Sequence, residues 1–211
     1  MNEPSGQAPG ALSRLRVLAV ACVAAMLWLP WAWSGAAGAI NAAGCVAAFV
    51  VLGPLAAANA GFGAARKWLA GAAVLFLIDA VYGLAFGSLN LFYVHGHAVK
   101  MPITVRLGDF VLGAAIWTIA GALIELASAG RNIDLRNSIA SRRDLYLMFL
   151  VAEGVVTGPV MALAYRQTGI DWNLLQLALG FVAIFKLIVM LLWALLLVRC
   201  SKGFESDDIL L

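Results

Sequence analysis

Charged side chains are scarce in this chain of 211 residues, of which 12% are charged and 64% are hydrophobic. A soluble domain carries about 25% charged residues. The mean hydropathy of +0.95 points the same way. The shortage of charge therefore excludes an ordinary soluble domain and predicts an integral membrane protein in contact with a lipid bilayer. The net charge of +3 gives no indication of a nucleic-acid partner.

Residue types that support catalysis and metal binding are also few. The three cysteines form no Cys-x-x-Cys pair and no Cys/His cluster, so neither redox chemistry nor a thiolate metal site is predicted. Both histidines fall in one connecting segment, so no predicted spanning helix carries a histidine for a haem or a serine–histidine pair. Clustered acids for Mg²⁺ and a phosphate-binding loop are missing as well. We therefore expect no enzyme activity, cofactor or metal.

Six runs are long enough for membrane-spanning helices, each of which needs about 20 mostly apolar residues. They predict an all-α bundle of six transmembrane helices over residues 16–198, at roughly 16–34, 38–62, 68–88, 106–127, 144–165 and 174–198. A disordered tail (1–15) precedes this bundle, and a short tail (199–211) follows it. The first run resembles a signal peptide, but its apolar core of about 17 residues is longer than usual, and we interpret it as a retained helix.

The positions of lysine and arginine predict the orientation. With the N-terminus in the cytoplasm, ten of the 14 basic residues fall in inside segments, three in outside segments and one within a span. This bias follows the positive-inside rule, so both termini are expected in the cytoplasm and the protein in the cell (inner) membrane. The longest predicted inside loop, 127–144, holds four arginines. It is interpreted as a contact for anionic lipid headgroups or as a docking site for a soluble partner.

Two prolines inside predicted spans, Pro54 and Pro159, each follow a glycine and are expected to kink their helices. They lie 105 residues apart (159 minus 54), and adding 105 to Asp79 gives 184, close to Lys186. One organisation is therefore a 3+3 inverted repeat, in which interrupted helices at matching positions indicate a transporter binding site. The rival organisation is three helical hairpins, each opened by a pair of basic residues on the cytoplasmic side.

Three charged residues lie near the middle of predicted spans: Asp79, Glu153 and Lys186. A charge at this depth costs about 2.5–3.5 kcal/mol on insertion scales. Lys186 is expected to pair with one of the two acids, and the other acid would be protonated, hold a cation or face water. These residues are candidates for a substrate or ion pathway. The alternatives are an internal structural network and a pairing across the interface with a partner subunit.

The segment 90–106 is the longest predicted outside connection. Its His95 and His97 are two residues apart, so one extended strand would place both on the same face. Together with Asp109, near the start of the next span, they are candidates for an outer vestibule. Two imidazoles are too few for a zinc site, and no metal is predicted here. The alternative is an ordinary connecting loop.

These features lead to one functional hypothesis and one rival. The first is a small membrane transport-type protein or permease subunit for proton-coupled or small-solute handling, with Asp79, Glu153 and Lys186 beside the kinks at Pro54 and Pro159. The rival is a non-catalytic accessory or scaffold subunit of a larger membrane complex. Six helices are a small body for transport, so self-association or another membrane subunit is expected in either case.

Overall fold

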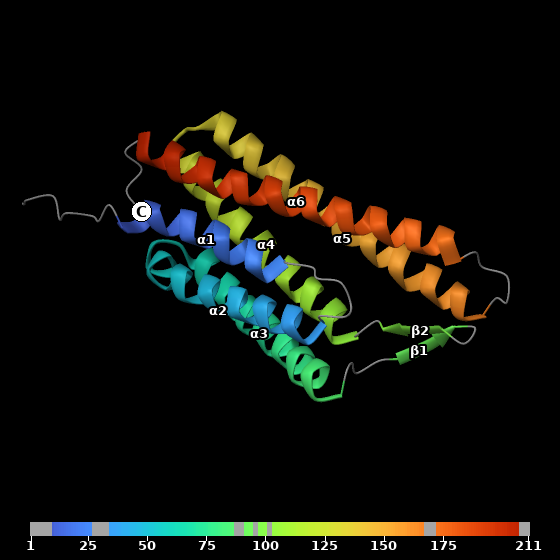
Figure 1. Cartoon of the computed structure of the whole chain (residues 1–211). Helices are drawn as coiled ribbons and strands as arrows, with labels where there is room; N and C mark the ends of the chain where they lie inside the picture. Colours follow the sequence, from blue (N-terminus) through green and yellow to red (C-terminus); the bar gives the residue numbers. More distant parts are fainter. Residues whose placement is uncertain are drawn as a thin grey trace, which may run out of the picture.

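The computed structural model describes residues 10–26, 34–86, 91–94, 97–100, 103–166 and 172–206, which form six helices and one two-stranded hairpin (Figure 1). The helices are α1 (Gly10–Met26), α2 (Ser34–Ala58), α3 (Ala60–Phe86), α4 (Ile103–Ala129), α5 (Ile133–Arg166) and α6 (Trp172–Ser206). A helix satisfies all of its backbone hydrogen bonds internally, which makes it the favoured form for long apolar runs in lipid. The helical fold class is confirmed.

Four of the helices contain a stretch that is long and apolar enough to cross a membrane. These stretches are Gly35–Ala57, Ala60–Ala85, Leu107–Ala129 and Ile184–Phe204. Helix α1 has 17 residues and α5 begins with a polar segment, and neither qualifies within the described part of the chain. The structure therefore supports a multi-pass membrane protein with four such helices, and the prediction of six spans is met only in part.

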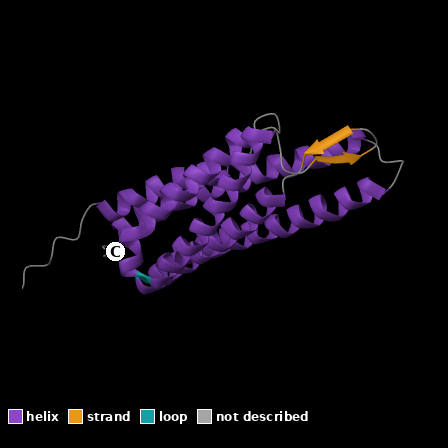
Figure 2. Cartoon of the chain, turned by 90° about the horizontal axis from the view of Figure 1, so that it is seen from below, coloured by secondary structure: helices purple, strands orange, loops and turns teal. Residues whose placement is uncertain are grey.

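The six helices close into a ring. Each helix packs against its neighbours in sequence, and α1 also packs against α6. Figures 1 and 2 show the helices running along a common direction, with the hairpin at one end of the molecule and the C-terminal end of α6 at the other. The largest side chains with no more than 2% exposure fill the core of the ring: Phe62, Phe76, Phe149, Trp193 and Phe204.

Helices α2 and α3 are closely packed against each other. A Cβ atom added at Gly38 would lie 2.9 Å from the carbonyl oxygen of Phe76 and 2.9 Å from the backbone nitrogen of Ala80. The two backbones are therefore in direct contact, as small residues allow in membrane proteins. Asn59 alone separates the helices and caps α3, because its side-chain oxygen accepts a hydrogen bond from the Gly61 N–H (2.7 Å).

The turn between α4 and α5 corrects one prediction. The segment 127–144 is not a long loop, because α4 ends at Ala129 and α5 begins at Ile133. Arg131 takes a left-handed conformation (φ 56°), and the Asn132 N–H donates to the Ala127 carbonyl (2.9 Å), which gives a Schellman-type helix end. Asn132 then caps α5 by accepting a hydrogen bond from the Leu135 N–H (2.9 Å).

The polar segment that follows is helical because its apolar side chains recur with helical spacing. Leu135 and Ile139 are four residues apart, and both are buried. Asp134 lies in the first turn, where a negative charge stabilises the helix dipole. The four arginines of 127–144 are thus presented from a turn and a helix instead of a loop.

The connection 90–106 contains the hairpin, which the all-α prediction did not include. Strand β1 (Leu91–Val94) pairs antiparallel with β2 (His97–Lys100), in the register Leu91↔Lys100 to Val94↔His97. Aromatic and β-branched residues favour strands, and LFYV is rich in them. Strand β1 also lies against α5. His97 is the first residue of β2, whereas His95 lies outside the described residues.

Candidate functional site

Lys186 on α6 forms a buried ion pair with Asp109 on α4. Its Nζ lies 3.0 Å from both carboxylate oxygens, so one ammonium donates to the whole carboxylate. The side chains are 11% and 8% exposed. Water and salt screen the attraction within a buried ion pair only weakly. The pair stabilises the fold only if its short contacts offset the cost of removing both charges from water. The two residues are 77 positions apart in the chain and join α6 to α4.

Glu153 on α5 lies at the level of this pair. A Cβ atom added at Gly154 would lie 3.3 Å from the ring of Phe110, so the residues next to Glu153 and Asp109 are in contact across α4 and α5. Glu153 is itself buried, with 6% exposure. We call Asp109, Glu153 and Lys186 the charged junction, since α4, α5 and α6 contribute one residue each.

Three aromatic side chains of α5 and α6 lie near the charged junction. Tyr146, about two helical turns before Glu153 on α5, is buried and lies within electrostatic range of both Asp109 and Glu153. Its ring centroid is 6.3 Å from that of Phe149, which in turn makes an edge-to-face contact at 5.6 Å with Phe185, next to Lys186. Tyr146 and Phe149 are buried, and electrostatic interactions are stronger in such an apolar environment than in water.

Asp79 lies apart from the charged junction, in the α2–α3 interface. It is 3% exposed, and a Cβ atom added at Gly38 of α2 would lie 3.0 Å from Asp79 Oδ2. Asp79 is one helical turn from Phe76, whose ring packs against Gly108, the neighbour of Asp109. The two aspartates are therefore at similar depth in the bundle. Asn41, three residues beyond Gly38, is also buried, and its Oδ1 accepts no hydrogen bond from the described residues.

The partner of Lys186 corrects the sequence interpretation. Lys186 was expected to pair with Asp79 or Glu153, but among the described residues its ion partner is Asp109. Asp109 was expected at a solvated helix end beside an outer vestibule, yet it is buried. The reason is that α4 begins at Ile103, so Asp109 lies nearly two turns inside the helix. Glu153 is buried on α5, and its neighbour Gly154 lies against Phe110, the neighbour of Asp109.

The two prolines do not both belong to this site. Pro54 lies 16 residues beyond Gly38 (54 minus 38), which places it about 24 Å along α2 from the level of Asp79. Its side chain is exposed, and α2 continues past it to Ala58. Pro159 lies within α5, and its side chain is outside the described residues. The predicted placement of Pro54 beside the buried charges is therefore wrong.

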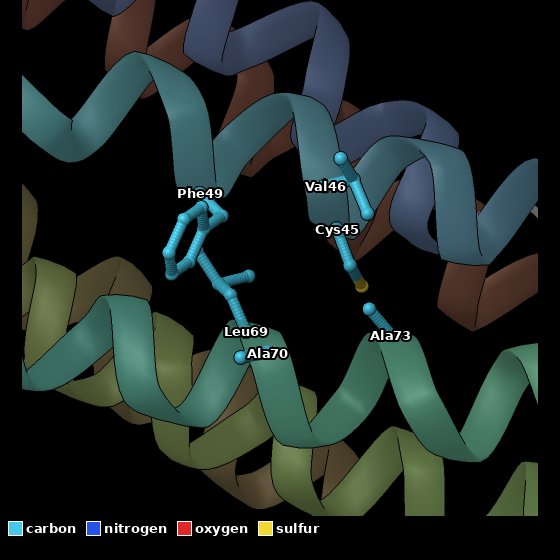
Figure 3. A pocket seen from close by; sticks show the side chains of 6 residues that line it. All are labelled: Cys45, Val46, Phe49, Leu69, Ala70 and Ala73. Carbon is cyan, nitrogen blue, oxygen red and sulfur yellow. The ribbon is translucent and has the colours of Figure 1, made fainter.

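The cavity shown in Figure 3 does not reach the charges. It measures about 300 Å³ and lies between α2 and α3, where it is lined by Cys45, Val46, Phe49, Leu69, Ala70 and Ala73. We call it the α2–α3 groove. All six lining residues are apolar, so the groove offers no polar group to a solute.

Carboxylates can bind protons or cations, and an ammonium can pair with a carboxylate. The two carboxylates and the ammonium of the charged junction are buried. The interaction energy between buried charges changes strongly with their distance and protonation. Within the described part of the chain, no three His, Cys, Asp or Glu side chains are placed to hold a metal ion.

Comparisons with protein-family models, with curated proteins and with solved structures found no match for this chain. Its function must therefore be inferred from its own residues.

Proposed function

We infer that the chain is a small multi-pass membrane protein of the transport type, or a permease subunit, that handles a proton or a small solute through its buried polar layer. The observation that carries this proposal is the charged junction. Asp109 and Lys186 form a buried ion pair between α4 and α6, and the buried Glu153 on α5 is next to Gly154, which lies against the neighbour of Asp109. Charges inside a membrane are costly and are usually functional. Asp79 and Asn41 extend the polar layer toward α2.

The proposed pathway uses the Lys186–Asp109 pair as its controlling element. Protonation of Asp109 removes the attraction that holds the Lys186 ammonium, which can then interact with Glu153 at the same level. A proton or a cation could thus exchange between two carboxylates around one lysine. The pair is 3.0 Å long and bidentate in the present arrangement, which corresponds to the closed state of such a pathway.

The proposal includes the topology predicted from the sequence. Helices α1 and α5 complete six spans, both termini lie in the cytoplasm, and the protein resides in the inner membrane. The α2–α3 and α4–α5 turns are at the same end of the ring as the start of α1 and the end of α6 (Figure 1), which is where the ten predicted inside basic residues belong in the sequence. The 3+3 inverted repeat remains a prediction within this proposal.

The second candidate is an accessory or scaffold subunit of a larger membrane complex. The observation that favours it is the same closed pair, because an ammonium that binds both oxygens of one carboxylate also fixes the register of α4 and α6. The α2–α3 groove, lined only by apolar residues, likewise provides no route for a polar solute.

Water access to the charged junction separates the two candidates. The three native cysteines are buried and are replaced by alanine in the test protein. Single cysteines are then placed at Leu112 and Leu150, close to the junction, and at Ile119, which is buried further along α4. In vesicles, a membrane-impermeant thiosulfonate should modify the cysteines at positions 112 and 150 and leave the cysteine at 119 unmodified. Equal protection at all three positions would contradict a transport pathway.

A flux measurement tests the role of Glu153 itself. Purified protein in liposomes containing a pH-sensitive dye should conduct protons under a potassium diffusion potential. Glu153→Gln should abolish this flux while the protein elutes as the wild type does in gel filtration. Protein-free liposomes give the baseline. A wild-type flux at this baseline, with both junction cysteines protected, would favour the accessory subunit.

A further inference from the structure

The α2–α3 groove opens on the outer surface of the helix ring. Val46, which forms part of its wall, is 52% exposed, and the nearby Val50 and Val74 are 63% and 57% exposed. In a bilayer this surface is covered by lipid chains. The groove volume of about 300 Å³ is at the lower end of the range for pockets that hold small molecules. Because its walls are wholly apolar, its occupant there must be a hydrocarbon group.

Arg66 lies at the end of the groove nearer to the Asn59 turn. Its Nε donates a hydrogen bond to the carbonyl of Phe49 (3.1 Å), and its guanidinium carbon is 4.1 Å from the centroid of the Phe49 ring. These two contacts fix the guanidinium beside a residue that lines the groove. A Cβ atom added at Gly53 would lie 3.8 Å from Arg66 Cζ, so the glycine leaves this side of the guanidinium open.

The rest of the guanidinium is available to a ligand. Nε carries the one hydrogen bond that Arg66 donates within the described residues, which leaves the N–H groups of Nη1 and Nη2 without a described acceptor. A planar guanidinium fork matches the geometry of a phosphate group. The nearby acid at this end, Glu125, accepts a hydrogen bond from Asn59 Nδ2 (2.9 Å).

The two residues after Arg66 fit the same membrane depth. Lys67 is exposed and adds a second positive charge, and Trp68 is 45% exposed. Tryptophan is enriched at the level of lipid headgroups, and juxtamembrane basic residues attract anionic lipids. Leu69 and Ala73 follow Arg66 by three and seven residues, or about 5 to 10 Å along α3. Along α3, the cationic residues therefore come first and the apolar groove follows. A phospholipid has the same order, because its charged headgroup is followed by its acyl chains.

We propose that the α2–α3 groove binds one acyl chain of an anionic phospholipid, whose phosphate is held by Arg66 and Lys67. The groove selects a hydrocarbon chain by its apolar lining, and the paired cations select a negatively charged headgroup. This site is separate from the charged junction and does not depend on transport activity.

Native mass spectrometry of the delipidated full-length protein in detergent tests the proposal. The protein is titrated with phosphatidylglycerol and with phosphatidylcholine of the same chain length. Ala73→Leu fills the groove without touching Arg66, and it should remove the bound phosphatidylglycerol. Lys67→Gln should weaken its binding about fivefold. Arg66→Lys keeps the positive charge but loses the planar guanidinium. It should weaken phosphatidylglycerol binding, but by less than Ala73→Leu does.

Matched controls define the outcome that overturns the proposal. Ala85→Leu changes an exposed alanine at the other end of α3, and Lys202→Gln removes an exposed charge on α6, and both should bind lipid as the wild type does. Equal binding of the two lipids by the wild type, or unchanged binding in Ala73→Leu, would refute the site. If Ala73→Leu instead converts a dimer to a monomer with lipid binding unchanged, the occupant is a second copy of the chain and the proposal is wrong.

Discussion

The α2–α3 interface and the charged junction hold neighbouring helices together by different means. Between α2 and α3, Gly38 brings one backbone to within van der Waals contact of the other. At the charged junction, long side chains bridge helices whose backbones are further apart, and Lys186 reaches Asp109 from α6. Lipid supplies little hydrophobic driving force between helices, so packing and polar contacts must provide the association. The clearest close backbone contact is thus in the α2–α3 interface, and the clearest buried ion pair is at the charged junction.

The two kinds of contact should also differ in the substitutions that they tolerate. A backbone contact is lost when any side chain is added, whereas a polar contact is lost when either partner is removed. Substitutions can therefore break the two kinds of contact separately.

Removing one partner of the ion pair should have the largest effect on stability. Asp109→Leu leaves the Lys186 ammonium buried without its partner and should lower the free energy of unfolding by about 3–5 kcal/mol. Adding Lys186→Met should restore most of this loss, because the double variant removes both charges of the pair. Thermal unfolding in detergent, with gel filtration as the readout of folded protein, measures the loss in the single variant and the recovery in the double variant. A single variant as stable as the wild type would mean that the pair contributes nothing to the bundle.

Filling a backbone contact should have the next largest effect. A Cβ atom added at Gly44 would overlap the backbone of Ala25 and Ala21 in α1, so Gly44→Ala should cost about 1–3 kcal/mol. At Gly121 an added Cβ would meet nothing within 4 Å, and Gly121→Ala should gain about 0.5–1 kcal/mol from its better helix propensity. Unfolding in a denaturant series compares them, and shifts of the same sign would contradict the close α1–α2 contact.

The two helix caps should differ by a smaller amount. Asn132→Ala removes the cap of α5 and should cost about 1 kcal/mol. Asn59→Ala removes the cap of α3 and also the hydrogen bond from Asn59 Nδ2 to Glu125, so its cost should exceed that of Asn132→Ala. The same denaturant series ranks them, and the reverse order would show that the link to α4 contributes nothing.

The smallest expected effect is a gain at the α4–α5 turn. Arg131→Gly relieves the left-handed conformation of a residue with a side chain and should add about 0.5–1 kcal/mol. Arg136→Gly, in the first turns of α5, should instead lose about 1 kcal/mol of helix propensity. Melting temperatures of the two variants, measured under the same conditions, test the turn geometry. If this segment were a loop, both substitutions would give similar small changes.

Several features of the fold could be predicted from the sequence because each depends on a local run of residues. Apolar runs such as 35–57 and 107–129 are long enough to identify a spanning helix without knowledge of their neighbours. The helical start of α5 could also have been found, since Asn132, Asp134, Leu135 and Ile139 give a cap, an acidic first turn and helical spacing. There, the charge content outweighed the periodicity in the sequence interpretation.

The partner of Lys186 could not be predicted in the same way. Asp79, Asp109 and Glu153 all lie in apolar helices, and the choice among them depends on which faces meet in the ring. Asp79 faces Gly38 of α2, whereas Asp109 faces the α5 and α6 side, and no periodicity in one helix shows the rotation of another. Pro54 was likewise assigned to the site by its residue type, although its position near the end of α2 excludes it.

The closure of the ring by α1 and α6 has a consequence for the timing of synthesis. Arg16 Nε donates to Ser201 Oγ (3.2 Å), and these residues are 185 positions apart. At about 5–20 residues per second, a ribosome needs roughly 10–40 s to make the intervening chain. During that interval α2 can pack against α1, but α6 has not yet been made. The face of α1 that contacts α6 therefore stays uncovered by α6 until the last helix has been synthesised. The last helix to be made therefore completes the environment of the first.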